Sequence, residues 1–234
     1  MKKISLKSFH NTPAFVREGA PDETVAKQTL GSEFALICDL LKNVRRENLV
    51  LDFGGYIGTA AVKFATSIPH STVVTVEPAP DNFEMLRLNT APYSNIIAVN
   101  AGVSSQRGKM QLLSRGTGEW GYTLVADPKD NSRPQHVAEV DVLTVGDVIG
   151  MTSLVKMPIS FAKIDIEGSE VALLRDVSWA DSVAIIMAEL HDRIVDGCSE
   201  AWENVQGLSG RITITDNGEK VISINPSLIK QLCS

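Results

Sequence analysis

Several features that narrow a protein's function are scarce or absent in this 234-residue chain. Its three cysteines, Cys38, Cys198 and Cys233, lie far apart and form no CxxC pair, so we expect a reduced, cytoplasmic protein. No apolar run approaches the roughly 18–20 residues that cross a bilayer. The first ten residues contain lysines but no apolar segment typical of a secretory signal. We therefore predict a chain without a membrane span.

The sequence also has no excess of basic residues over acidic ones. The 22 Lys and Arg residues against 28 Asp and Glu give a net charge of -6, which disfavours a general nucleic-acid binder. Small neutral or cationic ligands remain compatible with this charge. The 44% of hydrophobic and 21% of charged residues are ordinary for a globular protein and exclude wholesale disorder. The length fits one large domain, and the sequence indicates no particular oligomeric state.

Strand and helix patterns alternate along most of the chain. This alternation predicts βαβ units and a parallel sheet with helices on both faces. Near the end, two β-branched runs flank Asn217-Gly218, a strong hairpin signal. The prediction is an α/β doubly wound sheet with an antiparallel C-terminal hairpin on its edge. The expected strands are 48–53, 72–76, 95–99, 160–166 and 182–190, and the expected helices are 59–67, 81–90 with Asp81 as N-cap, 169–174 and 199–205.

Two segments stand apart from this alternation. Apolar residues from Asp22 to Val44 have roughly helical spacing, so we predict one helix within an N-terminal extension of residues 1–45. The main domain then comprises residues 46–234. Inside it, residues 114–134 are polar, rich in Gly, Asp and Pro, and contain Trp120 and Tyr122. Because loops of this length are commonly lids, we predict a lid over the binding site, with its two aromatic rings available for stacking.

The sequence LDFGGYIGT, residues 51–59, joins the first predicted strand to the first helix. Its glycines let the backbone turn sharply and approach a ligand, while the N–H groups of the helix point outward. The dinucleotide fingerprint G-x-G-x-x-G fits in neither register, which disfavours an NAD-dependent oxidoreductase. The remaining pattern, D-x-G-x-x-x-G, suits a ligand without a pyrophosphate. The cofactor-binding candidates of this loop are Asp52, Gly54, Gly55, Tyr56 and Gly58.

An acidic residue, Glu77, ends the second predicted strand. It follows Gly54 by roughly twenty residues, where a carboxylate commonly accepts hydrogen bonds from both ribose hydroxyls of an adenosine ligand. On its own, the glycine loop would be explained by a tight turn, and Glu77 by the cap of a strand end. Together they predict an adenosine cofactor, most simply S-adenosyl-L-methionine, bound near Glu77 and Pro78.

Polar residues also end two later strands that are otherwise apolar. Asp165 and Glu167 lie two residues apart, as do Glu189 and His191, so each pair shares a face if its strand continues that far. Open α/β sheets bind ligands at the carboxyl ends of their strands. Any one of these residues could simply lie in a solvent-exposed loop at the edge of the sheet, but the four together predict a functional site.

Two roles for these four residues remain open. In the first, His191 is a general base and Asp165 or Glu189 orients it, because a neutral imidazole accepts protons near pH 7. In the second, Asp165, Glu167, Glu189 and His191 bind Mg²⁺ or a similar divalent ion. The base is preferred, because a site for a hard metal draws mainly on oxygen ligands. We also place Asp165 at the cofactor.

Six stretches between Leu51 and about Arg193 carry a family resemblance: LDFGGYIG, VTVEPAPDNFEMLRLN, NAGVSS, VDVLTVGDVI, FAKIDIEGSEVALLRD and IIMAELH. In them the chain resembles the FkbM-type methyltransferases, which are Rossmann-like S-adenosylmethionine-dependent enzymes. The resemblance implies a seven-stranded, mostly parallel sheet and methyl transfer to a hydroxyl of a sugar, glycan or other small molecule. The family usually has Asn where this chain has Tyr56. Residues 1–45 and 207–234 lie outside the resemblance.

A rival of another class is a non-catalytic module that binds an adenosine cofactor or a partner on the same fold, since a fold does not fix a function. The acidic cluster favours the enzyme, because a module without chemistry has no need of it. The expected partner is a small-molecule or carbohydrate acceptor.

Overall fold

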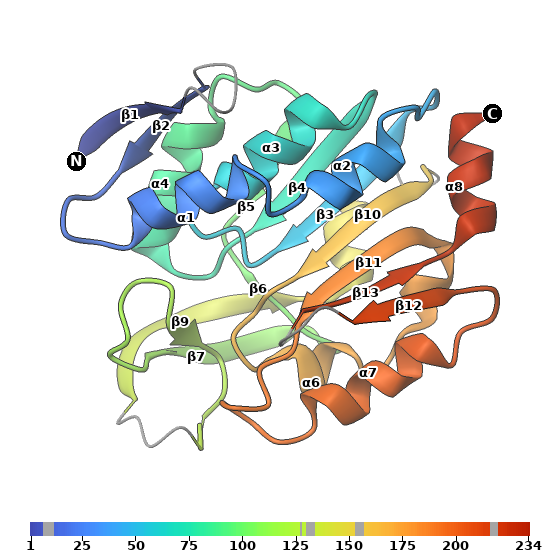
Figure 1. Cartoon of the computed structure of the whole chain (residues 1–234). Helices are drawn as coiled ribbons and strands as arrows, with labels where there is room; N and C mark the ends of the chain where they lie inside the picture. The colour runs from blue at the N-terminus through green and yellow to red at the C-terminus, as the bar shows by residue number, and fades with distance from the viewer. Residues whose placement is uncertain (7–11, 127, 130–133, 153–156, 216–219) are drawn as a thin grey trace.

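Seven strands form one central sheet in the computed structural model, which describes residues 1–6, 12–126, 128–129, 134–152, 157–215 and 220–234. Their order is β12-β13-β11-β10-β3-β4-β5 (Figure 1). All run parallel except β13, which is antiparallel to both of its neighbours. The strands are β3 (Asn48–Phe53), β4 (Ser71–Val76), β5 (Ile96–Val99), β10 (Ile159–Ile164), β11 (Val183–Glu189), β12 (Ile212–Thr215) and β13 (Lys220–Ile224).

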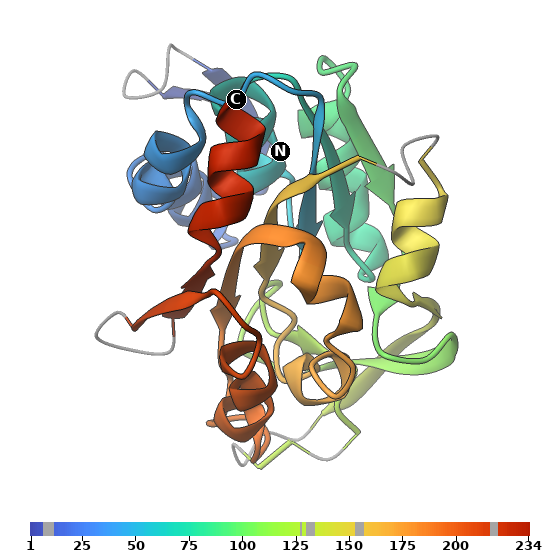
Figure 2. The ribbon, with the colours of Figure 1, turned by 90° about the vertical axis from the view of Figure 1, so that its right-hand side faces the viewer.

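Helices cover both faces of this sheet. Alternate residues of β3 pack on opposite sides, Leu51 with Val148 and Trp202 in one core and Val50 with Phe64 in the other. Figure 2 shows α2 and α8 on one side of the sheet and α5 on the other. The helices are α1 (Asp22–Thr29), α2 (Ala35–Leu41), α3 (Thr59–Ser67), α4 (Pro80–Thr90), α5 (Val145–Gly150), α6 (Glu170–Leu173), the 3₁₀ helix η2 (Ser178–Ser182), α7 (Cys198–Gln206) and α8 (Pro226–Cys233).

The predicted α/β doubly wound, Rossmann-like sheet with its C-terminal hairpin is confirmed. The predicted bounds of β3 and α3 match the structure, and the other predicted strands and helices of the sheet agree within two residues. Asn217-Gly218, on which the hairpin prediction rested, lies outside the described residues, although β12 and β13 pair as expected. Within the described residues, no helix is long and apolar enough to cross a membrane.

Three predictions are wrong in detail. The single helix expected from Asp22 is two helices, α1 and α2, because the chain turns at Gly31 so tightly that a Cβ atom would lie 2.4 Å from the Lys27 carbonyl oxygen. Asp81 is not the N-cap of α4, which begins at Pro80, a residue whose fixed φ suits a first helical turn. Strand β10 ends at Ile164, so the acidic residues after it lie beyond the strand.

Two further sheets were not predicted. The hairpin of β1 (Lys2–Leu6) and β2 (Thr12–Val16) contributes to a small core with α1, α3 and α4. The other sheet has the order β6-β9-β7-β8 and lies beside the carboxyl end of the central sheet (Figure 1). Its strands are β6 (Gly102–Val103), β7 (Gly108–Ser114), β8 (Tyr122–Thr123) and β9 (Gln135–Leu143). The predicted lid of residues 114–134 therefore contains a short strand, and its residues 127 and 130–133 lie outside the described residues.

Candidate functional site

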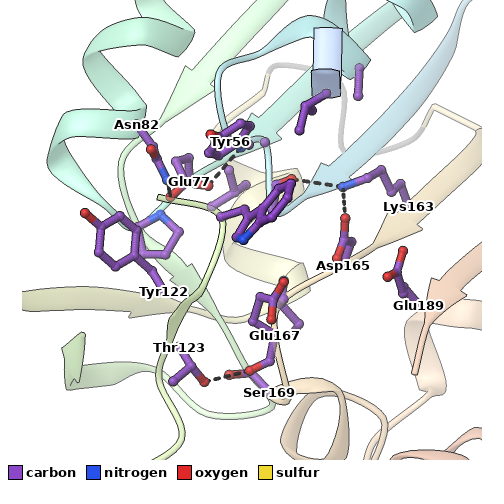
Figure 3. Close-up of a pocket in the computed structure, with 18 of the residues that line it drawn as sticks. Tyr56, Glu77, Asn82, Tyr122, Thr123, Lys163, Asp165, Glu167, Ser169 and Glu189 are labelled. Carbon is purple, nitrogen blue, oxygen red and sulfur yellow. Dashed lines mark hydrogen bonds and ion pairs between the residues drawn. The ribbon is translucent and has the colours of Figure 1, made fainter. Parts of the chain in front are cut away.

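A cavity of about 570 Å³ opens at the carboxyl ends of β3, β4, β10 and β11. This volume is typical of sites for small molecules. Figure 3 shows Tyr56, Glu77 and Asn82 on one side of it and the carboxylates of Asp165, Glu167 and Glu189 on the other. Among the predicted site residues, Gly54, Gly55, Tyr56, Glu77, Pro78, Asp165, Glu167 and Glu189 line the cavity, whereas Asp52, Gly58 and His191 are buried behind its wall.

The glycines allow the first loop to lie directly against its neighbours, Thr75 of β4 and Asp165 just after β10. At Gly54, where φ is 84°, a Cβ atom would lie 1.8 Å from the carbonyl oxygen of Asp165. At Gly55 it would lie 2.3 Å from the Thr75 hydroxyl oxygen. These glycines therefore permit a close approach to other parts of the protein itself, and the contact of Gly54 fixes the loop beside the predicted acidic site.

Glu77 ties the glycine loop to the start of α4. One carboxylate oxygen accepts a hydrogen bond from the Tyr56 N–H at 2.9 Å, and the other accepts one from the Ala79 N–H at 2.9 Å. Burial raises the pKa of Glu77 to about 7, although these backbone hydrogen bonds lower it. The oxygen that binds Ala79 also accepts a hydrogen bond from the Asn82 side chain at 3.5 Å, whereas the oxygen that binds Tyr56 keeps a second lone pair for a hydroxyl donor of a ligand.

The N-terminal extension completes this side of the cavity. The Tyr56 hydroxyl donates to the buried Asp22 carboxylate of α1 at 2.5 Å, and Arg17 donates to the same carboxylate at 2.9 Å. A second Arg17 contact, at 2.8 Å, reaches the side-chain oxygen of Asn82 on α4. Tyr56 therefore has a structural role, since its side chain links the glycine loop to α1.

Lys163 is a buried cation under the glycine loop. Its ammonium group donates to the Gly54 carbonyl oxygen at 2.9 Å and lies 3.4 Å from Asp52 and 3.3 Å from Asp165. Burial lowers the pKa of Lys163, but the two carboxylates outweigh it and raise this pKa above its ordinary value. Asp52 also accepts a hydrogen bond from Thr75 at 2.8 Å. Asp52 therefore supports the loop through Lys163, and its predicted effect on the cofactor would be indirect.

The structure brings together the four residues predicted at the acidic site. The Nε2 atom of His191 lies 3.8 Å from a carboxylate oxygen of Asp165, 3.8 Å from one of Glu167 and 3.9 Å from one of Glu189. These distances are too long for hydrogen bonds. Ligand atoms of Asp165, Glu167 and His191 all lie within 4.8 Å of one another, close enough to hold one metal ion.

The other ring nitrogen of His191 contacts a residue that the sequence analysis did not select. Nδ1 lies 3.0 Å from Glu170, whose two carboxylate oxygens also accept the backbone N–H groups of Ile166 and Gly168. Burial lowers the pKa of His191, but the hydrogen bond and charge of Glu170 outweigh it and raise this pKa to about 9. An imidazole with this pKa is mostly protonated at pH 7, and the ring does not line the cavity. Both observations argue against His191 as the direct base.

The profile of the methyltransferase FkbM domain matches residues 52–208. The chain belongs to this family. It is also similar to "Methyltransferase 1" of Beauveria bassiana (strain ARSEF 2860), with 26% identity over 165 residues, which cover 62% of this chain and 66% of that protein. The alignment thus spans slightly less than two thirds of the relative.

Solved structures with a similar fold have low sequence identity to this chain. A precorrin-6y C5,15-methyltransferase from Geobacter metallireducens GS-15 has 11% identity and a TM-score of 0.43, with 90% of each chain covered. The cofactor-bound Rv0187 from MTB has 15% identity and a TM-score of 0.48, with 90% of this chain and 83% of that chain covered.

Two residues of this FkbM-family site were missed although the sequence contained a signal for each. Lys163 is a lysine inside an otherwise apolar parallel strand, where a charge needs a buried partner. Glu170 follows Glu167 by three residues in the same acidic stretch, but its spacing does not show that it turns back toward His191. A third residue, Arg115 of the predicted lid, contacts Glu167 at 2.5 Å, and no local pattern indicates this pairing.

Proposed function

We propose that this FkbM-family protein is an S-adenosylmethionine-dependent O-methyltransferase that acts on a hydroxyl group of a small molecule, sugar or glycan. One observation carries the proposal. A single cavity joins the glycine loop and Glu77 to the carboxylates of Asp165, Glu167 and Glu189. A cofactor site and an acidic site within one enclosure are what methyl transfer to a hydroxyl requires, because the donor and the acceptor must be aligned.

The residues on the Glu77 side fit an adenosine cofactor. Glu77 would accept a hydrogen bond from a ribose hydroxyl, and Gly55 and Tyr56, which line the cavity, would pack against the same part of the ligand. Asn82 donates a hydrogen bond to the backbone oxygen of Glu119 at 2.8 Å, so this side also anchors the predicted lid. The bound cofactor supplies an electrophilic methyl group.

The acidic side would then prepare the acceptor. The hydroxyl oxygen forms a bond to the methyl carbon, the carbon–sulfur bond breaks, and its electron pair stays on sulfur. The hydroxyl proton must leave during this attack, and the carboxylates of Asp165, Glu167 and Glu189 would be its acceptors on the acidic side of the cavity. His191 lies behind them, with Nε2 3.8–3.9 Å from one oxygen of each.

The test is methyl transfer itself. The purified chain would be incubated with cofactor labelled on its methyl group and with fractionated small-molecule and glycan extracts of its source cells. Label should appear in a base-stable ether product. Thermal shifts should show stabilisation by S-adenosylmethionine and S-adenosylhomocysteine, by about 2.7 kcal/mol at 100 times Kd, and none by NAD. Binding without label transfer in any fraction would favour the non-catalytic module, and stabilisation by NAD alone would refute the cofactor.

Glu77 should make cofactor affinity depend on pH. Because burial raises its pKa to about 7, the carboxylate that accepts a ribose hydroxyl forms only as the pH rises through this value. We expect the affinity for S-adenosylhomocysteine, measured by calorimetry, to increase between pH 5.5 and pH 8. Glu77→Gln should bind at least about tenfold more weakly at pH 8, because a hydrogen bond to a charged group contributes about 1.5–3 kcal/mol. This variant should also lose the pH dependence, and a variant that retained it would exclude Glu77 as its source.

Trp120 tests the predicted lid. Its ring lines the cavity, is 46% exposed and donates through Nε1 to the Thr117 carbonyl oxygen at 2.7 Å. Trp120→Ala should raise the KM for the acceptor or lower kcat while leaving the affinity for S-adenosylhomocysteine within about twofold, because lids act on substrate commitment. A loss of cofactor affinity with unchanged acceptor kinetics would assign Trp120 to the cofactor pocket.

A further inference from the structure

We infer that Asp165, Glu167 and His191 form a binding site for one divalent metal ion, with Glu189 beside them as a further oxygen ligand. The site lies where the proposed acceptor hydroxyl would bind, so its role in the reaction rests on the proposed function. Ion binding itself does not, and it can be measured without an acceptor.

The orientation of the carboxylates is the first observation. Each of them directs one oxygen toward a cation of its own: Asp165 toward Lys163 at 3.3 Å, Glu167 toward Arg115 at 2.5 Å, and Glu189 toward Lys220 at 3.6 Å. In every case the other oxygen is the one that lies 3.8–3.9 Å from His191. Three separate cations therefore hold three carboxylates so that their second oxygens face a common point.

The second observation is independent of the acidic residues. His191 is completely buried, and its Nε2 atom has no hydrogen-bond partner among the described residues. Buried polar atoms in folded proteins almost always have a hydrogen-bond partner or a ligand, so an atom without one calls for a partner. Nε2 faces the same three carboxylate oxygens. The partner that would satisfy all four atoms is a cation between them.

The distances agree with this interpretation. Metal–ligand bonds of about 2.0–2.2 Å separate neighbouring ligand atoms by roughly 3 Å and opposite ones by roughly 4.3 Å. The separations around Nε2 fall between these limits, and the Asp165, Glu167 and His191 atoms lie within 4.8 Å of one another. They are too long for direct hydrogen bonds, whereas an ion in the centre would bring every atom into bonding range with small movements of the side chains.

Glu170 supplies the group that a metal-binding histidine usually needs. A ligating imidazole generally donates its other N–H to a carboxylate, which fixes the tautomer and the orientation of the ring. Nδ1 of His191 meets this requirement with Glu170 at 3.0 Å, and the Glu170 oxygens are themselves held by the backbone N–H groups of Ile166 and Gly168. Glu170 is therefore a positioning residue that directs Nε2 toward the carboxylates, where a metal ion would take the place of the Nε2 proton.

The ligand set selects the class of ion. Carboxylate oxygens suit Mg²⁺, Ca²⁺ and Mn²⁺, whereas an imidazole nitrogen favours transition metals. Mn²⁺ combines both preferences, so we expect Mn²⁺ to bind more tightly than Mg²⁺. When bound, such an ion lowers the pKa of a coordinated hydroxyl group.

The experiment measures Mn²⁺ binding to the full chain after removal of metals with EDTA. At pH 8, we expect one Mn²⁺ per chain by titration calorimetry, with loss of the free-ion electron paramagnetic resonance signal. Glu167→Gln and His191→Asn should weaken Mn²⁺ binding by at least tenfold, and Glu170→Gln should weaken it by about 10–100-fold through the ring of His191. Glu139→Gln, which changes an exposed carboxylate of β9 that pairs with Lys109 instead, should bind Mn²⁺ like the wild type.

Binding of S-adenosylhomocysteine to each variant shows that it is folded and separates this inference from the proposed function. A wild-type chain that binds the cofactor product but no Mn²⁺, Mg²⁺ or Zn²⁺ would refute the metal site and leave the methyltransferase proposal standing. Mn²⁺ binding that Glu167→Gln, His191→Asn and Glu170→Gln all leave unchanged would place the ion elsewhere and refute the site as well. Mn²⁺ binding in a protein that transfers no methyl group would retain the site and refute its role.

Discussion

Lys163→Met is expected to destabilise the fold by about 3–5 kcal/mol, because removal of one partner leaves a buried charge uncompensated. The carboxylate of Asp52 is fully buried, and the oxygen that lies 3.4 Å from Lys163 has no hydrogen-bond partner among the described residues. The variant also loses the hydrogen bond to the Gly54 carbonyl oxygen. Urea unfolding at pH 7 would measure the free energy, and the midpoint of thermal unfolding should fall by roughly 6–20 °C.

A second substitution identifies the cause. In the double variant Asp52→Asn/Lys163→Met the buried charge is gone, so we expect about half or more of the lost stability to return. Asp52→Asn alone should cost less than Lys163→Met, since Lys163 keeps Asp165 as a partner. If Lys163→Met stayed within about 1 kcal/mol of the wild type, or if the double variant were no more stable than the single one, the buried pair would not be what holds this loop.

Gly54→Ala should have the second large effect. The new methyl group would lie 1.8 Å from the Asp165 carbonyl oxygen and 2.9 Å from its carbonyl carbon, and both are backbone atoms without rotational freedom. The positive φ of 84° adds about 1–2 kcal/mol of backbone strain. With about 1–3 kcal/mol for the overlap, we expect a total loss of about 2–5 kcal/mol. Because the loop must move, the affinity for S-adenosylhomocysteine should fall at least tenfold by calorimetry.

Gly210→Ala is the matched control. Gly210 has a similar φ of 72°, but a Cβ atom there would meet nothing within 4 Å. Gly210→Ala should therefore lose only the about 1–2 kcal/mol of stability that backbone strain costs, and it should bind S-adenosylhomocysteine like the wild type. Equal losses of stability in the two variants, with cofactor affinity retained in Gly54→Ala, would mean that the approach of the loop to Asp165 is not required.

The sequence by itself determined the order and type of the elements of the central sheet. The bounds of β3 and α3 were predicted correctly, because an apolar run and a glycine turn mark them locally. The sequence also determined that the residues after β10 and β11 would meet, since parallel neighbouring strands end at the same edge of a sheet. Asp165 and His191 are close for this reason, although they lie 26 positions apart in the printed sequence.

The tertiary structure alone decided how these residues are paired. Beyond β10 the chain leaves the strand in a tight turn, with Glu167 at φ 51° and Gly168 at φ 99°, so the period of two no longer sets the direction of side chains. That turn brings Glu170 under His191, and the packing of α1 on the glycine loop brings Asp22 to Tyr56. Periodicity fixes the face on which a residue lies. Which distant residue it meets there depends on how loops and separate sheets pack, and no local pattern in the sequence encodes that.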